Sequence, residues 1–281
     1  MKRDIRGELS GILPDDLVGL VPRSFDVIGS KGRAVAVIEV PSELEPYGQA
    51  IGEALMRVQR NVQGVLSKGT ERMGEFRVRD MRLLAGDPDT EVLHKESGCV
   101  FKVDPGRVYF SPRESTEREN MSSKVAPGER VLVMFSGIGP FAICIAKRQP
   151  TAYCVAVELN PDAHAYCLEN IRLNKVGDRV RAVLGDVREV CPKLGERFDR
   201  VLMPLPKGAY EFLDTAIPMV KSGGVLHFYH WAPRDDPFSD GECILISAAE
   251  EFGRSVEILD RVRVSQYSPS AWKIRIDARI G

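Results

Sequence analysis

The sequence predicts an α/β protein in which a doubly wound, Rossmann-like domain follows a smaller α+β domain. A short apolar run at residues 131–134 leads directly into a glycine turn, as in a buried parallel strand that precedes a ligand-binding loop. From about residue 109 onward, predicted helices and strands alternate, which is typical of a parallel sheet covered by helices. Before that point the predicted strands are short and accompany a single helix, which is typical of a compact α+β unit.

Composition and charge limit the functions that are open to the chain. Its 281 residues suffice for one large or two modest domains, and its formal net charge of −1 creates no overall basic field for nucleic acid. Six cysteines without any Cys-x-x-Cys pair favour a reducing compartment and predict no metal site. The N-terminus lacks the apolar core of a signal peptide, and no apolar run approaches membrane-spanning length. We therefore expect a cytoplasmic monomer with no membrane partner.

The chain divides into three predicted parts. Residues 1–20 read as a short helical arm, residues 21–108 as the small α+β domain, and residues 109–281 as the doubly wound domain. In the small domain, strands are expected at residues 34–40, 91–94, 99–103 and 108–110, and Pro46 opens a helix. In the doubly wound domain, strands are expected at 131–134, 153–157, 179–184, 198–203 and 225–229, and two more follow near 256–264 and 272–278.

The glycine turn and the acidic residue after the next strand predict a nucleoside pocket. Gly137 and Gly139 allow a sharp turn and a close approach to a ligand, and Pro140 suits the first position of the following helix. The free N–H groups of that helix would then face the ligand. Glu158, at the end of the second strand, can accept hydrogen bonds from both hydroxyls of a ribose.

The wider set of residues favours S-adenosylmethionine over a nicotinamide dinucleotide. The glycine pattern alone also fits a dinucleotide or an ordinary turn that binds nothing. However, Phe135 before the glycines and Asp186 after the third strand add aromatic and acidic groups around one adenosine. The turn Pro204-Leu-Pro-Lys207 stands where methyltransferases of amino groups and ring nitrogens present a loop to the substrate. The final antiparallel strands fit the same fold by analogy.

Several motifs give the chain a family resemblance. They are Gly74-Glu-Phe-Arg-Val-Arg-Asp80, His94-Lys-Glu-Ser-Gly98, Tyr109-Phe-Ser-Pro-Arg-Glu-Ser-Thr-Glu-Arg118, Phe135-Ser-Gly-Ile-Gly-Pro-Phe141, Asn160-Pro161 and Glu169-Asn-Ile-Arg-Leu-Asn174. In these motifs, from about Pro22 to the C-terminus, the chain resembles the class I archaeal and eukaryotic tRNA (guanine-37-N1)-methyltransferases. It also resembles their wyosine-pathway relatives, which transfer an aminocarboxypropyl group.

The resemblance implies roles for individual residues. Glu117 would be the general base, and Arg77 would contact guanine O6. The residues expected to contact S-adenosylmethionine are Tyr109, Arg118, Phe135, Gly137, Gly139, Glu158, Leu159, Asp186, Val187, Pro204 and Pro206. The expected partner is the anticodon-loop region of tRNA, which residues 21–108 would help to grip.

The chemistry of N1 methylation needs residues of these two types. Guanine N1 carries a proton at neutral pH and becomes nucleophilic only when a base such as a carboxylate removes it. Negative charge then builds on O6, where an arginine can stabilise it. The alternatives are that Glu117 and Arg118 belong to a solvated run of charges, and that Arg77 is an ordinary strand-surface cation.

Two departures from the family pattern leave other functions open. Val133 stands where the family usually has an aspartate, and Pro204 stands where it usually has an asparagine. The lost carboxylate and amide would ordinarily help to hold the cofactor and the base. These departures leave a cofactor-bound RNA-binding paralogue without activity as one alternative. The resemblance itself leaves an aminocarboxypropyl transferase as the other. His227 and Tyr229, at the end of the fifth strand of the doubly wound domain, are expected to support the pocket wall.

Overall fold

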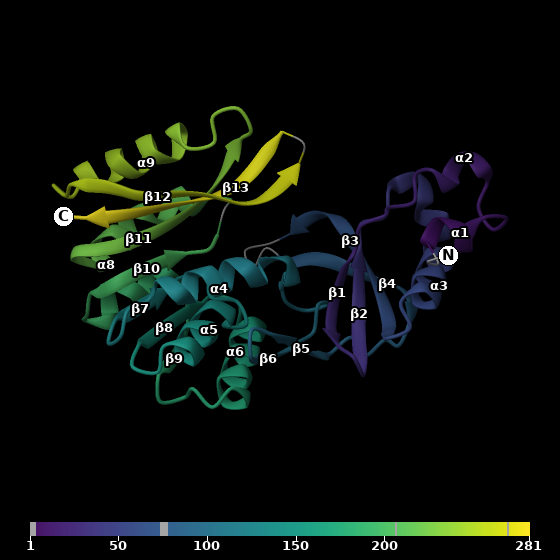
Figure 1. Ribbon diagram of the computed structural model, residues 1–281, viewed down its shortest axis with the longest axis horizontal. Coiled ribbons are helices and arrows are strands. Elements are labelled where there is room, and N and C mark those ends of the chain that lie inside the picture. Colours follow the sequence, from purple (N-terminus) through teal and green to yellow (C-terminus); the bar gives the residue numbers. More distant parts are fainter. Residues whose placement is uncertain (1–3, 74–77, 206, 269) are drawn as a thin grey trace. The chain divides into compact units, whose positions relative to one another are not determined.

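The computed structural model describes residues 4–73, 78–205, 207–268 and 270–281 (Figure 1). The chain forms two compact units, Met1–Thr116 and Glu117–Gly281. The division falls within helix α4 (Ser115–Lys124). The predicted α+β domain followed by a Rossmann-like domain is confirmed as the fold class. The roles assigned to residues 1–20, 21–108 and 109–281 stay predictions.

The first unit is built on a four-stranded sheet and one long helix. Its elements are α1 (Ile5–Leu9), α2 (Asp15–Val18), β1 (Asp26–Ser30), β2 (Arg33–Ile38), η1 (Ser42–Tyr47), α3 (Gly48–Val58), β3 (Val62–Met73), β4 (Val78–Gly86), β5 (Val92–Glu96), β6 (Cys99–Val103) and η2 (Pro112–Glu114). The sheet order is β1-β2-β3-β4, and only the β2–β3 pair, which α3 connects, is parallel. Ile51, Ala54 and Leu55 of α3 recur at helical spacing and are fully buried.

A separate hairpin, β5–β6, follows the four-stranded sheet. Its two-residue turn places Ser97 at φ 44° and Gly98 at φ 75°, the left-handed conformations that tight hairpin turns need. The strand expected at residues 108–110 is absent, and that prediction is wrong. The N–H of Val108 instead bonds to the carbonyl of Asp104 in a turn, so the Pro105-Gly106 segment keeps the chain from extending there.

The second unit alternates strands and helices as predicted. Its elements after α4 are β7 (Arg130–Val133), α5 (Pro140–Arg148), β8 (Tyr153–Glu158), α6 (Pro161–Leu173), β9 (Val180–Leu184), α7 (Val187–Val190), η3 (Cys191–Leu194), β10 (Phe198–Met203), η4 (Ala209–Phe212), α8 (Leu213–Met219), β11 (Val220–Pro233), α9 (Ser239–Glu250), β12 (Val256–Ser268) and β13 (Ala271–Ile280). The strand order in the sheet is β12-β13-β11-β10-β7-β8-β9.

The strand order of this sheet predicts where a ligand binds. Strands β7 to β11 are parallel, and β7 lies between β8 and β10. The chain therefore moves outward from β7 to β9 in one direction and returns to β10 on the other side. In doubly wound sheets, ligands bind beyond the carboxyl ends of the strands at such a switch point. The glycine turn after β7 and the loop after β10 both begin there.

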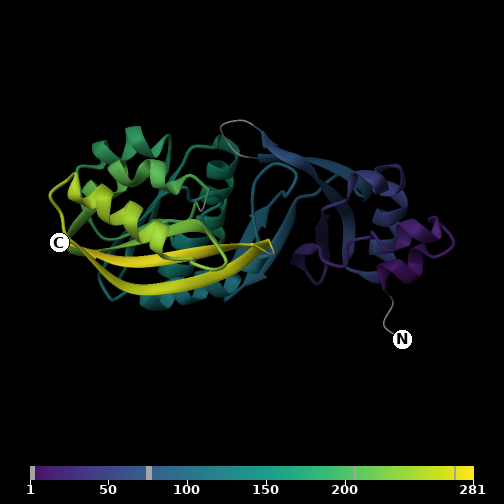
Figure 2. The ribbon, with the colours of Figure 1, turned by 90° about the horizontal axis from the view of Figure 1, so that it is seen from above.

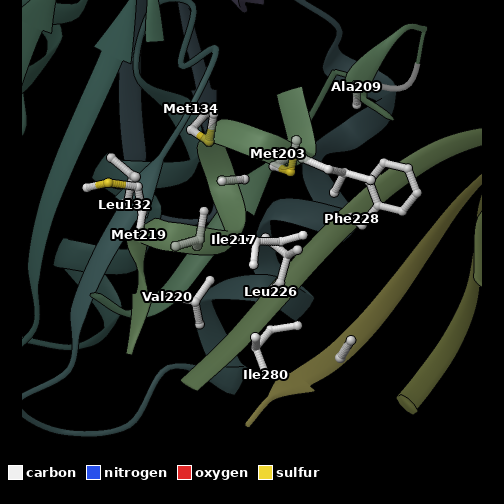
Figure 3. Packing of buried hydrophobic residues seen from close by; sticks show 14 of the residues in the cluster. Leu132, Met134, Met203, Ala209, Ile217, Met219, Val220, Leu226, Phe228 and Ile280 are labelled. Carbon is white, nitrogen blue, oxygen red and sulfur yellow. The ribbon is translucent and has the colours of Figure 1, made fainter. Parts of the chain in front are cut away.

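Alternate residues of the strands face two different layers. One face packs against α7, α8 and α9 in a cluster of buried apolar residues. Figure 3 shows part of this cluster, in which Ile217 of α8 lies beside Leu226 of β11. Helices α5 and α6 pack against β7, β8 and β9, and the alternate residues of those strands point to that side because side chains alternate across a sheet.

The last two strands form a long antiparallel hairpin at one edge of the sheet, drawn in yellow-green and yellow in Figure 2. Strand β13 alternates Lys273, Arg275 and Asp277 with apolar residues that face the α8–α9 layer. Such alternation ordinarily predicts a solvent-exposed polar face. Here the three polar side chains are buried, with exposed fractions of 4%, 1% and 2%. Among the described residues, no helix is long and apolar enough to cross a membrane.

We expect Leu226→Ala to destabilise the second unit by about 2–5 kcal/mol, because Leu226 is fully buried between β11 and the helices that cover it. The matched control is Leu184→Ala, since Leu184 is 49% exposed at the end of β9. Both tryptophans, Trp231 and Trp272, belong to this unit, so urea unfolding followed by tryptophan fluorescence measures the difference. Equal effects of the two substitutions would contradict this packing.

Candidate nucleoside pocket and buried carboxylate

The loop after β7 has the geometry that was expected of a ligand-binding turn. Gly137 and Gly139 adopt φ angles of 56° and 86°, and Pro140 is the first residue of α5. A Cβ atom added to Gly139 would lie 2.6 Å from Sγ of Cys167, so only glycine fits there. Phe135 also has a positive φ, 55°, which is unfavourable for a bulky residue. Such strain is typical of functional loops.

Glu158 ties this loop to the end of β8. Its Oε2 accepts a hydrogen bond from the N–H of Gly137 at 2.6 Å, and its Oε1 accepts one from the N–H of Asn160 at 2.9 Å. Burial raises the pKa of Glu158 above its usual value and outweighs these N–H donors, which act in the opposite direction. Each carboxylate oxygen keeps a second lone pair, so the pair can still accept the two hydroxyls of a ribose.

A buried polar atom beside the loop supports a polar ligand here. The hydroxyl of Ser136 is buried, and among the residues that the structure describes it has no hydrogen-bond partner. Buried polar groups are normally paired, and an exception often indicates a ligand or ordered water. Sequence reasoning missed Ser136, although its place between Phe135 and Gly137 in the predicted loop was a usable signal.

Phe212 of η4, which follows β10, contacts both Phe135 and Arg188 of α7, which follows β9. The rings of Phe135 and Phe212 meet edge to face with centroids 4.8 Å apart, and the guanidinium carbon of Arg188 lies 4.0 Å from the centre of the Phe212 ring. The Asp186 carboxylate accepts the N–H of Arg188 at 2.7 Å and caps α7. Neighbouring Val187 is buried. Phe212 and Arg188 were not predicted from the sequence.

The loop after β10 starts next to the glycine loop. The N–H of Met134 donates to the carbonyl of Leu202 at 3.0 Å, which joins the ends of β7 and β10. Pro204 follows β10 and is half-buried. Leu159, between Glu158 and Asn160, is also half-buried. The ends of β7, β8, β9 and β10 thus gather the loop, a carboxylate and an aromatic side chain, as a nucleoside requires.

Glu117 and Arg118 are buried in α4, with exposed fractions of 5% and 2%. The alternative that they belong to a solvated run of charges is therefore wrong. The hydroxyl of Tyr229 in β11 donates to Oε1 of Glu117 at 2.6 Å, and the guanidinium of Arg275 in β13 donates to the same oxygen. Tyr229 also meets Phe141 of α5, with ring centroids 6.2 Å apart. The carboxylate is thereby linked to the first turn of the helix that the glycine loop opens.

Arg275 is held by a second carboxylate, that of Asp277. Its Nε lies 2.7 Å from Oδ1 and its Nη2 lies 3.2 Å from Oδ2. Asp277 also bonds Nδ1 of His227 at 2.6 Å and lies 3.1 Å from Nζ of Lys124. Burial alone would raise the pKa of Asp277, but the hydrogen bonds from His227 and Arg275 and the charge of Arg275 outweigh it and lower that pKa. This aspartate is therefore ionised at neutral pH.

The chain of contacts continues to β10. Nε2 of His227 lies 2.8 Å from Nη1 of Arg200, whose Nε and Nη2 bond both carboxylate oxygens of Glu129. Arginine can only donate, so Nε2 accepts and the ring proton sits on Nδ1, where it donates to Asp277. Burial lowers the pKa of His227 despite its aspartate neighbour, which fits this neutral form. His227, which was predicted to support the pocket wall, thus has Asp277 and Arg200 as its hydrogen-bond partners.

Three residues that were predicted for the site cannot be placed in the pocket or among the contacts of Glu117. Arg77 and Pro206 lie outside the described residues. Tyr109 belongs to the first unit and is 59% exposed. Within residues 4–73, 78–205, 207–268 and 270–281, no group of three or more His, Cys, Asp or Glu side chains could hold a metal ion. Arg275 was missed from the sequence, where it stands in an unremarkable alternating strand.

Comparison with known proteins gives consistent matches along the chain. Residues 92–257 match the TRM5/TYW2 methyltransferase domain, and residues 5–90 match the TYW2 N-terminal domain. The chain is 41% identical over 268 residues to tRNA (guanine(37)-N(1))-methyltransferase Trm5b of Pyrococcus abyssi, covering 95% of this chain and 78% of that protein. The crystal structure of Trm5b from Pyrococcus abyssi superimposes with a TM-score of 0.85 at 40% identity, covering 96% and 78% of the two chains.

A second group of similar proteins is named for aminocarboxypropyl transfer instead of methyl transfer. The chain is 35% identical over 285 residues to the tRNA(Phe) (4-demethylwyosine(37)-C(7)) aminocarboxypropyltransferase of Pyrococcus horikoshii, covering 100% of this chain and 97% of that protein. The crystal structure of P. horikoshii TYW2 in complex with MeSAdo superimposes with a TM-score of 0.80 at 32% identity, covering 98% and 97%.

The buried position of Asp277 predicts a pH-dependent loss of stability in Asp277→Asn. A depressed folded-state pKa stabilises the protein above the unfolded-state pKa, about 3.9, and this contribution is lost as the pH falls through the folded-state value. We expect the variant to lose about 3–5 kcal/mol at pH 7, because Arg275 loses its buried partner. The difference from the unsubstituted protein should shrink below about pH 4.

Urea unfolding between pH 3 and pH 7 measures this difference. The matched control is Asp260→Asn, since Asp260 bonds the same Lys124 at 2.9 Å but has a side chain that is 45% exposed. Its loss should stay below about 1 kcal/mol. A pH-independent difference for Asp277→Asn would mean that the carboxylate charge does not stabilise the fold.

Proposed function

The chain belongs to the TRM5/TYW2 methyltransferase family, and we propose that it methylates N1 of guanine 37 in tRNA with S-adenosylmethionine. The observation that carries this proposal is the buried carboxylate of Glu117, held by Tyr229 beside the helix that the glycine loop opens. N1 methylation of guanine needs a carboxylate of this kind near the cofactor. The 41% identity to a protein named for this reaction supports the same conclusion.

The residues after β7, β8 and β9 fit an S-adenosylmethionine molecule. Glu158 would accept the ribose hydroxyls with lone pairs that its bonds to Gly137 and Asn160 leave available. Phe135 and Val187 would border the adenine, and the unpaired Ser136 hydroxyl would complete its hydrogen bonding to a polar group. Bound S-adenosylmethionine supplies an electrophilic methyl group on a sulfonium.

Glu117 takes the N1 proton of the guanine. The base becomes nucleophilic as that proton leaves, and the charge that builds on O6 calls for a cation. Arg77 is proposed for this role on the family resemblance alone. A protein of net charge −1 must hold tRNA through local basic clusters. We propose that the first unit contributes to holding the anticodon-loop region and that the protein acts as a cytoplasmic monomer.

A second candidate is aminocarboxypropyl transfer in the wyosine pathway. The match of residues 5–90 to the TYW2 N-terminal domain favours it, as does the full-length similarity to a named aminocarboxypropyltransferase. Val133, which is fully buried in β7 where the family usually has an aspartate, instead favours a third candidate, a cofactor-bound RNA-binding protein without activity. A chain without that carboxylate would hold the amino-acid end of the cofactor differently.

Mass spectrometry of tRNA nucleosides distinguishes these functions. Unmodified tRNA transcripts and tRNA carrying a wyosine precursor are each incubated with the protein and S-adenosylmethionine. Methylated guanosine at position 37, with S-adenosylhomocysteine as the by-product, would support methyl transfer. A three-carbon amino-acid adduct, with methylthioadenosine as the by-product, would support the second candidate. Bound but unmodified tRNA would contradict both and favour a binding protein.

We expect Glu158→Ala to weaken S-adenosylmethionine binding by about 1.5–3 kcal/mol, the scale of a hydrogen bond to a charged group. Calorimetry measures the affinity, and Glu250→Ala, an exposed glutamate of α9, is the matched control. Because burial raises the pKa of Glu158, the affinity of the unsubstituted protein should fall on acidification from a pH above about 4.3, the value of an ordinary glutamate. Unchanged affinity in a folded variant would remove Glu158 from the site.

Glu117→Gln should lower single-turnover methylation by a factor on the order of 10²–10⁴, because the amide keeps the shape but not the basicity of the carboxylate. The affinities for tRNA and S-adenosylmethionine should change little. Glu119→Gln is the control, since Glu119 lies two residues further along α4 and is exposed. A variant at Glu117 that methylates at nearly the unsubstituted rate would exclude this residue as the base.

A further inference from the structure

We propose that Tyr229 and Arg275 are positioning residues that anchor Oε1 of Glu117 and leave Oε2 to take the proton from the substrate. This inference rests on the proposed function and extends it to two residues of the sheet. The sequence motifs that carry the family resemblance contain neither of them. Both known contacts of the Glu117 carboxylate end on Oε1, so Oε2 takes part in neither.

The two donors are fixed by the sheet itself. Tyr229 of β11 and Arg275 of β13 are directly paired across adjacent antiparallel strands, so their side chains leave the same face side by side. Their exposed fractions are 0% and 1%. Strand backbones hold positions more tightly than loops do, and a site built on them is correspondingly precise. Glu117 reaches the pair from α4, 158 positions earlier in the sequence than Arg275.

Charged side chains of α4 and β13 surround the carboxylate of Glu117. On the side of β13, Arg275 and Asp277 form a two-bond ion pair, and Lys124 of α4 lies against Asp277. His227 of β11 is neutral, as its lowered pKa indicates. The two cations, Arg275 and Lys124, therefore face three carboxylates, those of Asp277, Glu117 and Asp260, the last of which lies 2.9 Å from Nζ of Lys124. Protonation of Glu117 leaves each cation with a carboxylate partner.

Protonation of Glu117 leaves the ion pair between Arg275 and Asp277 in place. Arg275 uses Nη1 for Glu117 but Nε and Nη2 for Asp277. After Glu117 becomes neutral, the guanidinium still has its ion pair with Asp277, so no buried cation is left unpaired. Protonation of the carboxylate therefore does not dismantle the cluster.

Tyr229 acts as a donor at every working pH. Burial, with the negative charge of Glu117 beside it, raises the pKa of the Tyr229 hydroxyl well above its usual value, so the group stays protonated. Its ring is held by Lys273 of β13, whose Nζ lies 5.1 Å from the ring centre, and by Phe141 of α5. In the reaction, the N1–H bond breaks, the proton passes to Oε2, and its electron pair stays on the guanine. That pair forms the new N1–carbon bond as the carbon–sulfur electrons remain on sulfur.

The test compares the pH dependence of single-turnover methylation in Tyr229→Phe, Arg275→Lys and Asp277→Asn. Removing the Tyr229 hydroxyl takes one donor from the ionised carboxylate, so the acid limb of the rate should move to higher pH by roughly 1–2 units. Arg275→Lys, which cannot reproduce the fork of the guanidinium, should shift the limb in the same direction. Asp277→Asn removes an anion beside Arg275, leaving more of its charge for Glu117, and should shift the limb to lower pH.

A purely structural network gives a different result. All three variants would then lose thermal stability without moving the acid limb, and that outcome would overturn the inference. Tyr153→Phe is the matched control, since Tyr153 lies at the start of β8 and has no contact with Glu117 in the described part of the chain. Its acid limb should coincide with that of the unsubstituted protein.

The proposed function and this inference can fail separately. If the unsubstituted protein methylates no guanosine, the proposed function fails. ¹³C NMR of the Glu117 carboxyl carbon then decides the inference without turnover, because Tyr229→Phe should raise the pH at which this carbon titrates by the same 1–2 units. Identical titrations in the two proteins would overturn it.

Discussion

The requirement that a buried charge be fully paired governs the second unit. Arg275 is 1% exposed, and a guanidinium without partners would be very costly at that depth. Asp277 supplies a two-bond partner from the same strand, and Glu117 supplies another from α4. To deliver Glu117 and Lys124, α4 must cover the polar face of β11 and β13. The ion pairs therefore specify where this helix docks, a role that is better attested for buried charges than simple stabilisation.

This constraint also connects the proposed base to the cofactor loop. Tyr229 bonds Glu117 on one side and packs against Phe141 on the other. Phe141 is the second residue of α5, whose start is set by Gly139 and Pro140. Glu158 fixes the same loop by accepting the N–H of Gly137. A proton acceptor and a ribose acceptor are consequently held by one rigid set of strand ends, as catalysis by positioning requires.

Two residues of the cofactor loop and the adjoining strand end are in energetically unfavourable states. Phe135 has a left-handed backbone, and the burial that raises the pKa of Glu158 disfavours its charge. Both features are unfavourable for the fold, and both lie at the carboxyl ends of the strands. The large apolar cluster between the sheet and helices α7, α8 and α9, against which Phe135 also packs, supplies the stability that such sites consume.

The sequence by itself determined the alternation of strands and helices in the second unit, and it located the glycine loop and the acid that ends β8. Local signals suffice there, because the glycine turn, the Asn160-Pro161 cap and the acid that ends β8 act over a few residues. It could not reveal Arg275, or that Glu117 and Arg118 are buried. The alternating charges in β13 and the charged run of α4 each predict a solvent-exposed face. Only the tertiary structure decided otherwise, because it brings two such surfaces together and their opposite charges replace the water that each would need alone.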